Sequence, residues 1–130
     1  CVSRPSKKDF DKKLARYNKI SLEASKQSGR GIIPEVTSFL TLEEAFKEMA
    51  KADCSLVLYE KGGVRFTESN IQRAKSIAIL IGSEGGFEES EIELAKSYGV
   101  KPLWLGHRIL RCETAPIAAI SIAMLLTENL

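Results

Sequence analysis

Apolar residues recur every three or four positions in two stretches near the start of the chain, which is the spacing of one face of an α-helix. The first stretch covers residues 9–27, and Gly29 follows it in the manner of a C-terminal cap. The second begins after Thr41, whose hydroxyl is placed to form a capping box with Glu44. The positions predicted to face inward on this second helix are Leu42, Ala45, Phe46 and Met49. Between the two helices, residues 36–40 are predicted to run extended.

Short apolar runs alternate with helical patterns through the remainder of the chain. Three runs, at residues 55–59, 76–81 and 100–105, are predicted strands. The second run is continuously apolar from residue 77 onward and rich in isoleucine, so it is predicted to be buried on both faces of a parallel sheet. Helices are predicted over residues 67–73, 88–98 and 113–126. This alternation predicts an α/β fold with a mostly parallel sheet flanked by helices.

Two of the predicted strands end in loops that contain glycine. The first motif loop belongs to Ile-Leu-Ile-Gly-Ser-Glu-Gly-Gly-Phe, residues 79–87, and the second to Leu-Gly-His-Arg-Ile-Leu-Arg-Cys-Glu-Thr-Ala, residues 105–115. Ligands of α/β proteins bind beyond the carboxyl ends of strands, so the two loops are expected to outline one pocket. Gly82, Gly85 and Gly86 leave room for a ligand beside the backbone, or serve only the geometry of a tight turn. Acidic groups disfavour a phosphate here and favour a neutral or cationic ligand, the acids being Glu84, Glu88, Glu89 and Glu91.

Together the two motif loops closely resemble those of the RsmE family of ribosomal RNA methyltransferases, which belong to the SPOUT class with a trefoil-knotted fold. A third match is Lys-Gln-Ser-Gly-Arg at residues 26–30, followed by Pro34. The resemblance implies that residues 1–130 form a single SPOUT-like methyltransferase domain, without the β-rich RNA-binding domain that precedes it in the family. It also implies a C-terminal knot, formed where the chain after Leu103 threads behind the loop after Ile81.

The resemblance further implies that S-adenosylmethionine is the cofactor, held in the knot mainly by backbone groups at three strand ends. Leu58, Leu103 and Ile109 would supply apolar walls for the adenine, a role that is compatible with ordinary core packing. The implied cofactor-binding residues are Leu58, Tyr59, Ile81, Gly82, Gly85, Leu103, Trp104, Leu105, Gly106, Arg108, Ile109 and Leu110.

The reaction implied by the resemblance is methylation of N3 of a uridine in small-subunit ribosomal RNA. The N3 proton must then be removed, or the resulting anion stabilised. Arg111 is predicted to stabilise negative charge on the uracil carbonyls, and Glu84 is predicted to accept the proton. Holding the turn is an alternative role for Glu84, and salt bridging to Glu84 or Glu113 is an alternative for the arginines. The predicted RNA-binding residues are Arg30, Arg108 and Arg111.

Composition limits the other possibilities. The chain of 130 residues is 44% hydrophobic, enough for one globular core, and no apolar stretch reaches the roughly 18 residues of a membrane span. Three cysteines without close spacing argue against a disulfide framework and predict a reducing compartment, the cytoplasm. With His107 as the only histidine, a zinc site is disfavoured and metal-free chemistry is predicted. We interpret His107 as a loop residue and Cys112 as a packed thiol without a nucleophilic role.

Charge is distributed unevenly along the chain. The first thirty residues contain nine Lys/Arg and three Asp/Glu, a net charge of +6, whereas the remaining hundred contain ten and fourteen, a net charge of −4. A basic arm on a mildly acidic body indicates contact with a polyanion at one face. The alternative interpretation is a helix surface that is simply solvated.

The helix predicted over residues 113–126 is apolar on nearly every side, so it must be covered on every side. The sheet can cover one face, and a second copy of the chain is predicted to cover the other. Ala118 and Ala119 would let two such helices approach closely. We therefore expect a homodimer that includes this helix and brings Arg30 of one subunit beside the cofactor of the other.

Two further functions compete with the methyltransferase. In the resembling family, proline usually stands where this chain has Ser83 and His107. Loss of activity through these two replacements would leave a catalytically weak RNA-binding or ribosome-assembly module with the same fold. A nucleotide-binding hydrolase that uses the first motif loop is the third possibility, but the Gly-x-x-x-x-Gly-Lys-Ser/Thr sequence of a phosphate-binding loop does not occur.

Overall fold

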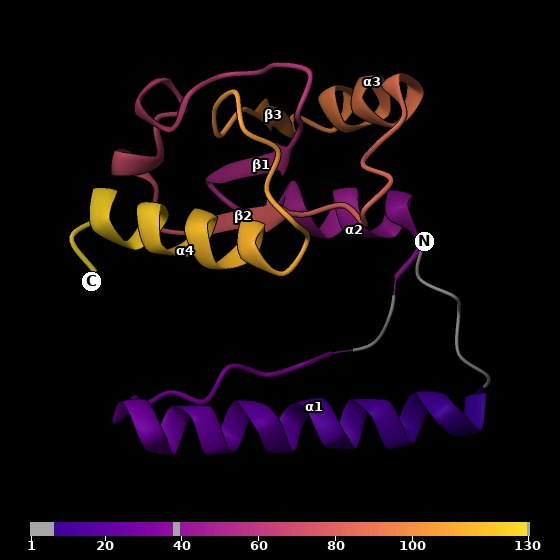
Figure 1. Ribbon diagram of the computed structural model, residues 1–130, viewed down its shortest axis with the longest axis vertical. Helices are drawn as coiled ribbons and strands as arrows, with labels where there is room; N and C mark the ends of the chain where they lie inside the picture. The colour runs from indigo at the N-terminus through magenta and orange to yellow at the C-terminus, as the bar shows by residue number, and fades with distance from the viewer. Residues whose placement is uncertain (1–6, 38–39, 130) are drawn as a thin grey trace. The chain divides into compact units, whose positions relative to one another are not determined.

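The computed structural model describes residues 7–37 and 40–129 and divides the chain into two compact units, within residues 41–130 and within residues 2–40 (Figure 1). The elements of the larger unit are the helices α2 (Leu42–Met49), α3 (Glu89–Ser97) and α4 (Thr114–Leu126), the strands β1 (Cys54–Leu58), β2 (Ile77–Leu80) and β3 (Lys101–Leu103), and the 3-10 helices η1 (Phe66–Glu68) and η2 (Ile71–Arg73). Among the described residues, no helix is both long enough and apolar enough to cross a membrane.

The three strands form a parallel sheet in the order β2-β1-β3, with Leu56 of β1 opposite Ile79 on one side and Lys101 on the other. Each strand boundary lies within two residues of its predicted position. The residues of β1 from Cys54 to Val57 are buried, whereas all four residues of β2 are only partly buried. The second strand was predicted to be buried on both faces. It packs against a core on each face, through Ile77 and Ile79 on one and Ala78 and Leu80 on the other, but only partly, because within the described part of the chain β2 lies at the edge of the sheet.

Side chains alternate between the two faces of the sheet, so β1 contributes to two separate cores. Leu56 lies in the core that α4, η1 and η2 cover, and Val57 lies in the core that α2 and α3 cover (Figure 1). The first core comprises Cys54, Leu56, Phe66, Ile71, Leu103, Ala119 and Ala123. The second comprises Phe46, Met49, Val57, Ile92, Ala95 and Val100. The larger unit is thus a three-layer α/β fold, which confirms the predicted parallel sheet flanked by helices.

Local sequence fixes the starts of α2 and α3. The Thr41 hydroxyl accepts a hydrogen bond from the Glu44 amide at 3.2 Å, and the Glu44 carboxylate accepts one from the Thr41 amide at 2.7 Å. This is the predicted capping box, which satisfies two backbone donors that a helix start leaves without partners. At the start of α3, the Glu91 carboxylate accepts a hydrogen bond from the Glu88 amide at 2.8 Å.

The segment between β1 and β2 differs from its prediction. The single helix expected over residues 67–73 is instead two short 3-10 helices, η1 and η2. Asn70 separates them with a φ of 61°, a left-handed conformation that asparagine tolerates better than most residues. Ile71 then lies fully buried beneath α4, so the bend places an apolar side chain in the first core.

The buried positions of α4 are small residues, and Ile122 and Leu126 add partly buried contacts to the first core, whereas other large residues of the helix are exposed. Its buried positions are Ala115, Ala119 and Ala123, spaced four apart, so a narrow alanine stripe faces the core. The exposed fractions of Ile117, Ile120 and Leu125 are 69%, 52% and 62%. Ala119 was expected at a contact between helices, but it is fully buried in the first core, where it lets α4 lie close to the sheet.

The smaller unit contains α1 (Lys7–Ser28), the predicted first helix extended by two residues at its start and one at its end. The Asn18 side chain donates to the Val36 carbonyl and accepts from the Val36 amide, both at 2.9 Å, and the Ser21 hydroxyl donates to the Pro34 carbonyl. These bonds hold the segment after the helix along its surface. No strand forms in residues 30–37, and Ser38 and Phe39 of the predicted extended run lie outside the described residues.

Candidate functional site

A cavity of about 520 Å³ lies at the carboxyl ends of the three strands. Ligand sites of small molecules usually occupy cavities of this size, and in α/β sheets they usually lie at this edge. The two motif loops line it together, as predicted. Its walls are formed by Leu58, Tyr59, Glu60, Ile81, Gly82, Ser83, Glu84, Gly85, Gly86, Phe87, Trp104, Leu105, Gly106, Arg108, Ile109, Leu110, Arg111, Cys112, Glu113 and Ala115.

Eleven of the twelve predicted cofactor-binding residues line this cavity, and Leu103 is the exception. Its side chain is fully buried in the first core, beside Ala119. Alternation along β3 explains the difference, because the side chain of Leu103 faces α4 while the next residue, Trp104, turns to the cavity. The structure therefore places Leu103 in the core and not in the predicted apolar wall for adenine.

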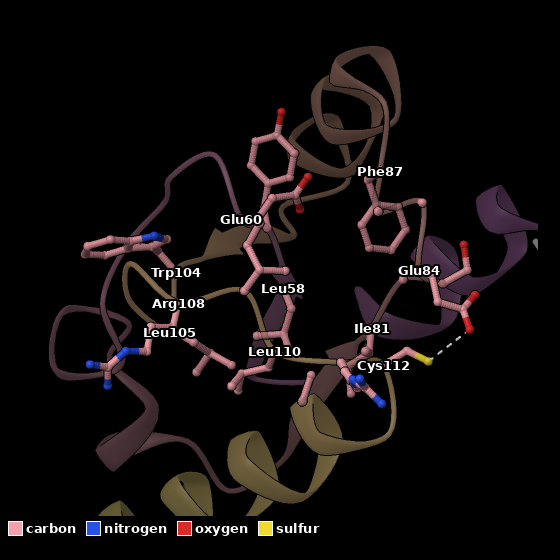
Figure 2. A pocket seen from close by; sticks show the side chains of 18 of the residues that line it. Leu58, Glu60, Ile81, Glu84, Phe87, Trp104, Leu105, Arg108, Leu110 and Cys112 are labelled. Atoms are coloured by element: carbon pink, nitrogen blue, oxygen red, sulfur yellow. Dashed lines mark hydrogen bonds between the residues drawn. The ribbon is translucent and has the colours of Figure 1, made fainter.

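Apolar side chains form the floor of the cavity. Figure 2 shows Leu58, Leu105 and Leu110 close together at its centre, with Ile81 beside them. Leu58 and Leu105 also pack against the first core, so their positions are fixed by the fold. Ile109, which was predicted to form a wall, is 82% exposed and lies at the rim.

The first motif loop forms a tight turn in which the Gly86 amide donates to the Ser83 carbonyl at 2.9 Å. Serine therefore supports this turn at the position where the resembling family has proline. Two lining residues that the sequence analysis did not single out, Glu60 and Phe87, flank the turn. A Cβ atom at Gly86 would lie 3.0 Å from a Glu60 carboxylate oxygen, and one at Gly82 would lie 3.0 Å from the Phe87 ring. Only their positions in the sequence could have indicated that they line the cavity, because Glu60 follows the first predicted strand and Phe87 follows the double glycine.

A carboxylate of the first motif loop meets a thiol of the second. The Cys112 Sγ donates to the Glu84 carboxylate across 3.6 Å (Figure 2). Hydrogen bonding to its own backbone amide, and then to the Cys112 thiol, lowers the pKa of Glu84. Burial, followed by the neighbouring carboxylates of Glu113 and Glu84, raises the pKa of Cys112. Glu84 is thus an ionised and weakly basic group at neutral pH, and Cys112 stays a thiol, which is the unreactive form.

One grouping in the described part of the chain has the spacing of metal ligands. The donor atoms of Glu84, Cys112 and Glu113 lie within 4.8 Å of one another. The two carboxylates are exposed, and acidic groups with this arrangement are common without an ion. A raised thiol pKa also disfavours coordination through Cys112, since thiolate is the form that binds metal. Metal-free chemistry stays a prediction.

Arg108 and Arg111 both line the cavity with exposed side chains. Within the described residues, neither arginine forms an ion pair with Glu84 or Glu113. The structural salt bridges considered as an alternative are therefore not formed. Arg30 lies in the other unit, directly after α1, and its predicted contact with RNA stays a prediction.

Opposite walls of the cavity differ in charge. Figure 2 shows Trp104 and Arg108 on one side, and Glu84 and Cys112 on the other. The carboxylate of Glu60 stands near the glycine turn. A ligand bound between these walls would meet acidic groups at the first motif loop and a cation at the start of the second.

Comparison with known proteins identifies relatives along nearly the whole chain. The family model of the RNA methyltransferase domain matches residues 1–124. The ribosomal RNA small subunit methyltransferase E of Mesomycoplasma hyopneumoniae is 33% identical over 119 residues, covering 89% of this chain and 50% of that protein. The protein of the same name from Bacillus subtilis is 34% identical over 130 residues, covering 95% of this chain and 51% of that protein. The chain thus spans about half the length of the curated relatives it matches.

Solved structures share the fold. A Legionella pneumophila protein in complex with S-adenosylmethionine superposes with a TM-score of 0.86 and 34% identity, covering 96% of this chain and 51% of that one. The ribosomal RNA small subunit methyltransferase E of Neisseria gonorrhoeae, also bound to S-adenosylmethionine, superposes with a TM-score of 0.85 and 33% identity, covering 91% and 49%. These relatives confirm the resemblance carried by the motif loops, and with the family model spanning residues 1–124, the chain belongs to the RNA methyltransferase domain family.

Proposed function

We propose that this chain is the catalytic domain of a methyltransferase that uses S-adenosylmethionine to methylate N3 of a uridine in small-subunit ribosomal RNA. The observation that carries the proposal is the cavity of about 520 Å³ where the two motif loops meet at the carboxyl ends of parallel strands. Relatives named for this activity, 33% and 34% identical, support it, as do two similar structures that contain the cofactor.

The residues of the cavity fit this cofactor. Leu58, Leu105 and Leu110 offer an apolar surface for adenine. Glu60 and Glu84 offer negative charge to the ammonium and sulfonium groups of the cofactor. The same negative charge would repel a phosphate ligand.

Backbone groups of the loops add donors to the cavity. The amides of Tyr59 and Trp104 already donate, to the Leu103 and Val64 carbonyls at 3.0 Å each. Within the described residues, the amides of Leu105 and Gly106 have no such acceptor, so they are left for a ligand.

Arg111 carries the larger catalytic role in this proposal. When bound, S-adenosylmethionine supplies an electrophilic methyl group. Arg111 stabilises the negative charge that the uracil carbonyls gain as N3 loses its proton. Glu84 accepts that proton, but its lowered pKa makes it a weak base. Positioning of the uracil within the cavity supplies much of the remaining acceleration.

The proposal extends to the assembly of the domain. Residues 1–130 form one SPOUT-like domain, supported by the match over residues 1–124, with a C-terminal trefoil knot in which the chain after Leu103 threads behind the loop after Ile81. The exposed apolar face of α4, at Ile117, Ile120 and Leu125, supports a homodimer. The proposal includes a cytoplasmic location, which suits a ribosomal RNA substrate.

Calorimetry with S-adenosylmethionine, S-adenosylhomocysteine and ATP separates this function from its alternatives. The first two are expected to bind and ATP is not; binding of ATP alone would instead indicate the hydrolase. Methyl transfer to small-subunit ribosomal particles, with the modified nucleotide mapped, then tests the substrate. Cofactor binding without any transfer to uridine N3 would favour the catalytically weak RNA-binding module. The intact turn at Ser83 argues against that module.

A further inference from the structure

Aromatic and cationic side chains meet around Trp104, a residue of the cavity wall. Trp104 was expected to hold the cofactor mainly through its backbone, and Arg65 and His107 have no role in the proposed reaction. The Arg65 guanidinium carbon stands 5.8 Å from the Trp104 ring centroid, and the His107 ring meets Trp104 edge-on with centroids 4.8 Å apart. We call Arg65, Trp104 and His107 the Trp104 platform. Arg65 and His107 are exposed, and Trp104 is half-buried.

Core packing does not account for Trp104. It belongs to neither of the two cores and is not among the partly buried apolar residues that pack against them. Tryptophan is costly to leave at a surface unless its ring has a contact to make. Figure 2 shows its indole beside Arg108 and directed away from the cavity centre, on the wall opposite Glu84.

The backbone holds the platform in place without a ligand. Val64 forms a parallel bridge with Leu103; the Val64 amide donates to the Pro102 carbonyl at 2.9 Å, and the Trp104 amide donates to the Val64 carbonyl at 3.0 Å. A Cβ atom at Gly63 would lie 2.3 Å from the Pro102 carbonyl oxygen, so only glycine permits this approach. The backbone that carries Arg65 is therefore held beside that of Trp104 before anything binds, which lowers the entropic cost of recognition.

Flat rings and guanidinium planes are the groups on which unpaired nucleobases stack, and neighbouring cations attract the phosphates between them. The Trp104 platform combines both, and Arg108 adds a second cation at the same wall. The acidic groups Glu60 and Glu84 stand at the first motif loop instead. The Trp104 side thus combines a ring with two cations, which favours approach of a polyanion there, in addition to Arg111 next to Cys112.

We propose that the Trp104 platform stacks a nucleobase of single-stranded RNA that flanks the nucleotide held in the cavity. This inference rests on the proposed function, because it assigns a binding surface for the same substrate. Arg65 supplies a planar cation, while Trp104 and His107 supply rings. The platform therefore contacts the face of a base and not its hydrogen-bonding edge.

Trp104 is the single tryptophan of the chain, so intrinsic tryptophan fluorescence reports on the platform directly. We expect a short single-stranded RNA of mixed sequence to quench this fluorescence in the presence of saturating S-adenosylhomocysteine. Arg65→Gln and His107→Ala are each expected to weaken RNA binding about tenfold, the range for a stacking contact, with S-adenosylhomocysteine affinity unchanged. Arg65→Lys keeps the charge without the plane and should recover only part of the loss.

Two controls make the test specific. Arg73→Gln removes an exposed cation of η2, outside the cavity lining, and should leave RNA affinity near that of the unchanged chain. Heparin carries negative charge without bases and should leave the fluorescence unquenched. Equal quenching by heparin, or normal RNA affinity in both platform variants, would overturn the inference while methyl transfer remained intact. Failure of the proposed function is a different result, in which S-adenosylhomocysteine does not bind and no methyl group is transferred.

Discussion

The Sγ atom of Cys112 lies 3.6 Å from a carboxylate oxygen of Glu84, so a thiol of the second motif loop donates a hydrogen bond to an acid of the first. The two residues are 28 positions apart in the chain. The bond joins the two loops across the cavity, and after the hydrogen bond from its own backbone amide it is the second cause of the lowered pKa of Glu84.

Removing the thiol tests this link. Cys112→Ala should raise the pKa of Glu84 towards its ordinary value, because one hydrogen bond to the charged form is lost. Cys112→Ser keeps a donor and should hold the pKa low. Carboxyl chemical shifts followed during an acid titration measure both. A lowered pKa stabilises the fold above the unfolded value, and that effect is lost as pH falls through the folded value. Cys112→Ala should therefore be less stable than the unchanged chain at neutral pH, and the difference should vanish in acid. An unaltered Glu84 titration in Cys112→Ala would contradict the link.

Arg111→Ala should lower the rate of methyl transfer about a hundredfold, the order expected for one lost electrostatic donor. Affinity for S-adenosylhomocysteine should stay near normal, because the arginine is assigned to the uracil and not to the cofactor. Single-turnover kinetics and calorimetry measure the two effects. Loss of cofactor binding in this variant would show that the assigned role is wrong.

Gly106→Val should abolish S-adenosylhomocysteine binding. Gly106 has a φ of 128°, and a Cβ there would meet no atom of the described protein within 4 Å, so the added side chain projects into open space at the cavity. Gly99→Val is a matched control, since Gly99 also has a positive φ of 79° and open surroundings but lies outside the cavity lining. Each change strains the backbone by about 1–3 kcal/mol. Calorimetry should find binding lost only at Gly106; equal loss in both variants would indicate general unfolding.

Thr41→Ala should destabilise the larger unit by about 1 kcal/mol, because it removes the hydroxyl of the capping box. Thermal or urea unfolding measures the change. Thr37→Ala, at an exposed threonine in the other unit, is the control and should have little effect. Equal stability of the two variants would show that the cap contributes nothing.

Ile120→Glu should convert the proposed dimer to a monomer, because it places a charge on the exposed apolar face of α4. Light scattering at micromolar concentration measures the mass. Leu94→Glu, at a 38% exposed leucine of α3, controls for the general effect of a new surface charge and should remain dimeric. A monomeric unchanged chain that binds the cofactor fully would remove the basis for the dimer.

Features set by neighbouring residues could be predicted from the sequence. The capping box of Thr41 and Glu44 needs only two residues three positions apart, and the structure contains it. The two motif loops were expected to meet because each follows a strand of one parallel sheet, and they line one cavity. Both inferences depend on rules that hold within a few residues of an element's end.

Features set by distant contacts could not be predicted. The apolar run of β2 does not reveal whether its strand lies at the centre or the edge of the sheet, and the structure places it at the edge. The left-handed backbone conformation of Asn70 goes with the burial of Ile71 beneath α4, a contact that the local sequence does not reveal. Arg65 and Trp104 are far apart in sequence and meet only because Val64 pairs with Leu103.

The central position of β1 has a consequence for the order of folding. Of the three strands of this sheet, β1 is synthesised first and lies between two partners made later, and its pairing with β3 joins residues 56 and 101. Such long-range pairing forms slowly. A nascent chain that has not reached Lys101 therefore presents one unpaired apolar edge of β1, the kind of edge to which other chains attach. Pairing of β3 closes that edge and also brings the second motif loop, which directly follows β3, to the cavity, so protection from aggregation and formation of the ligand site depend on the same strand pairing.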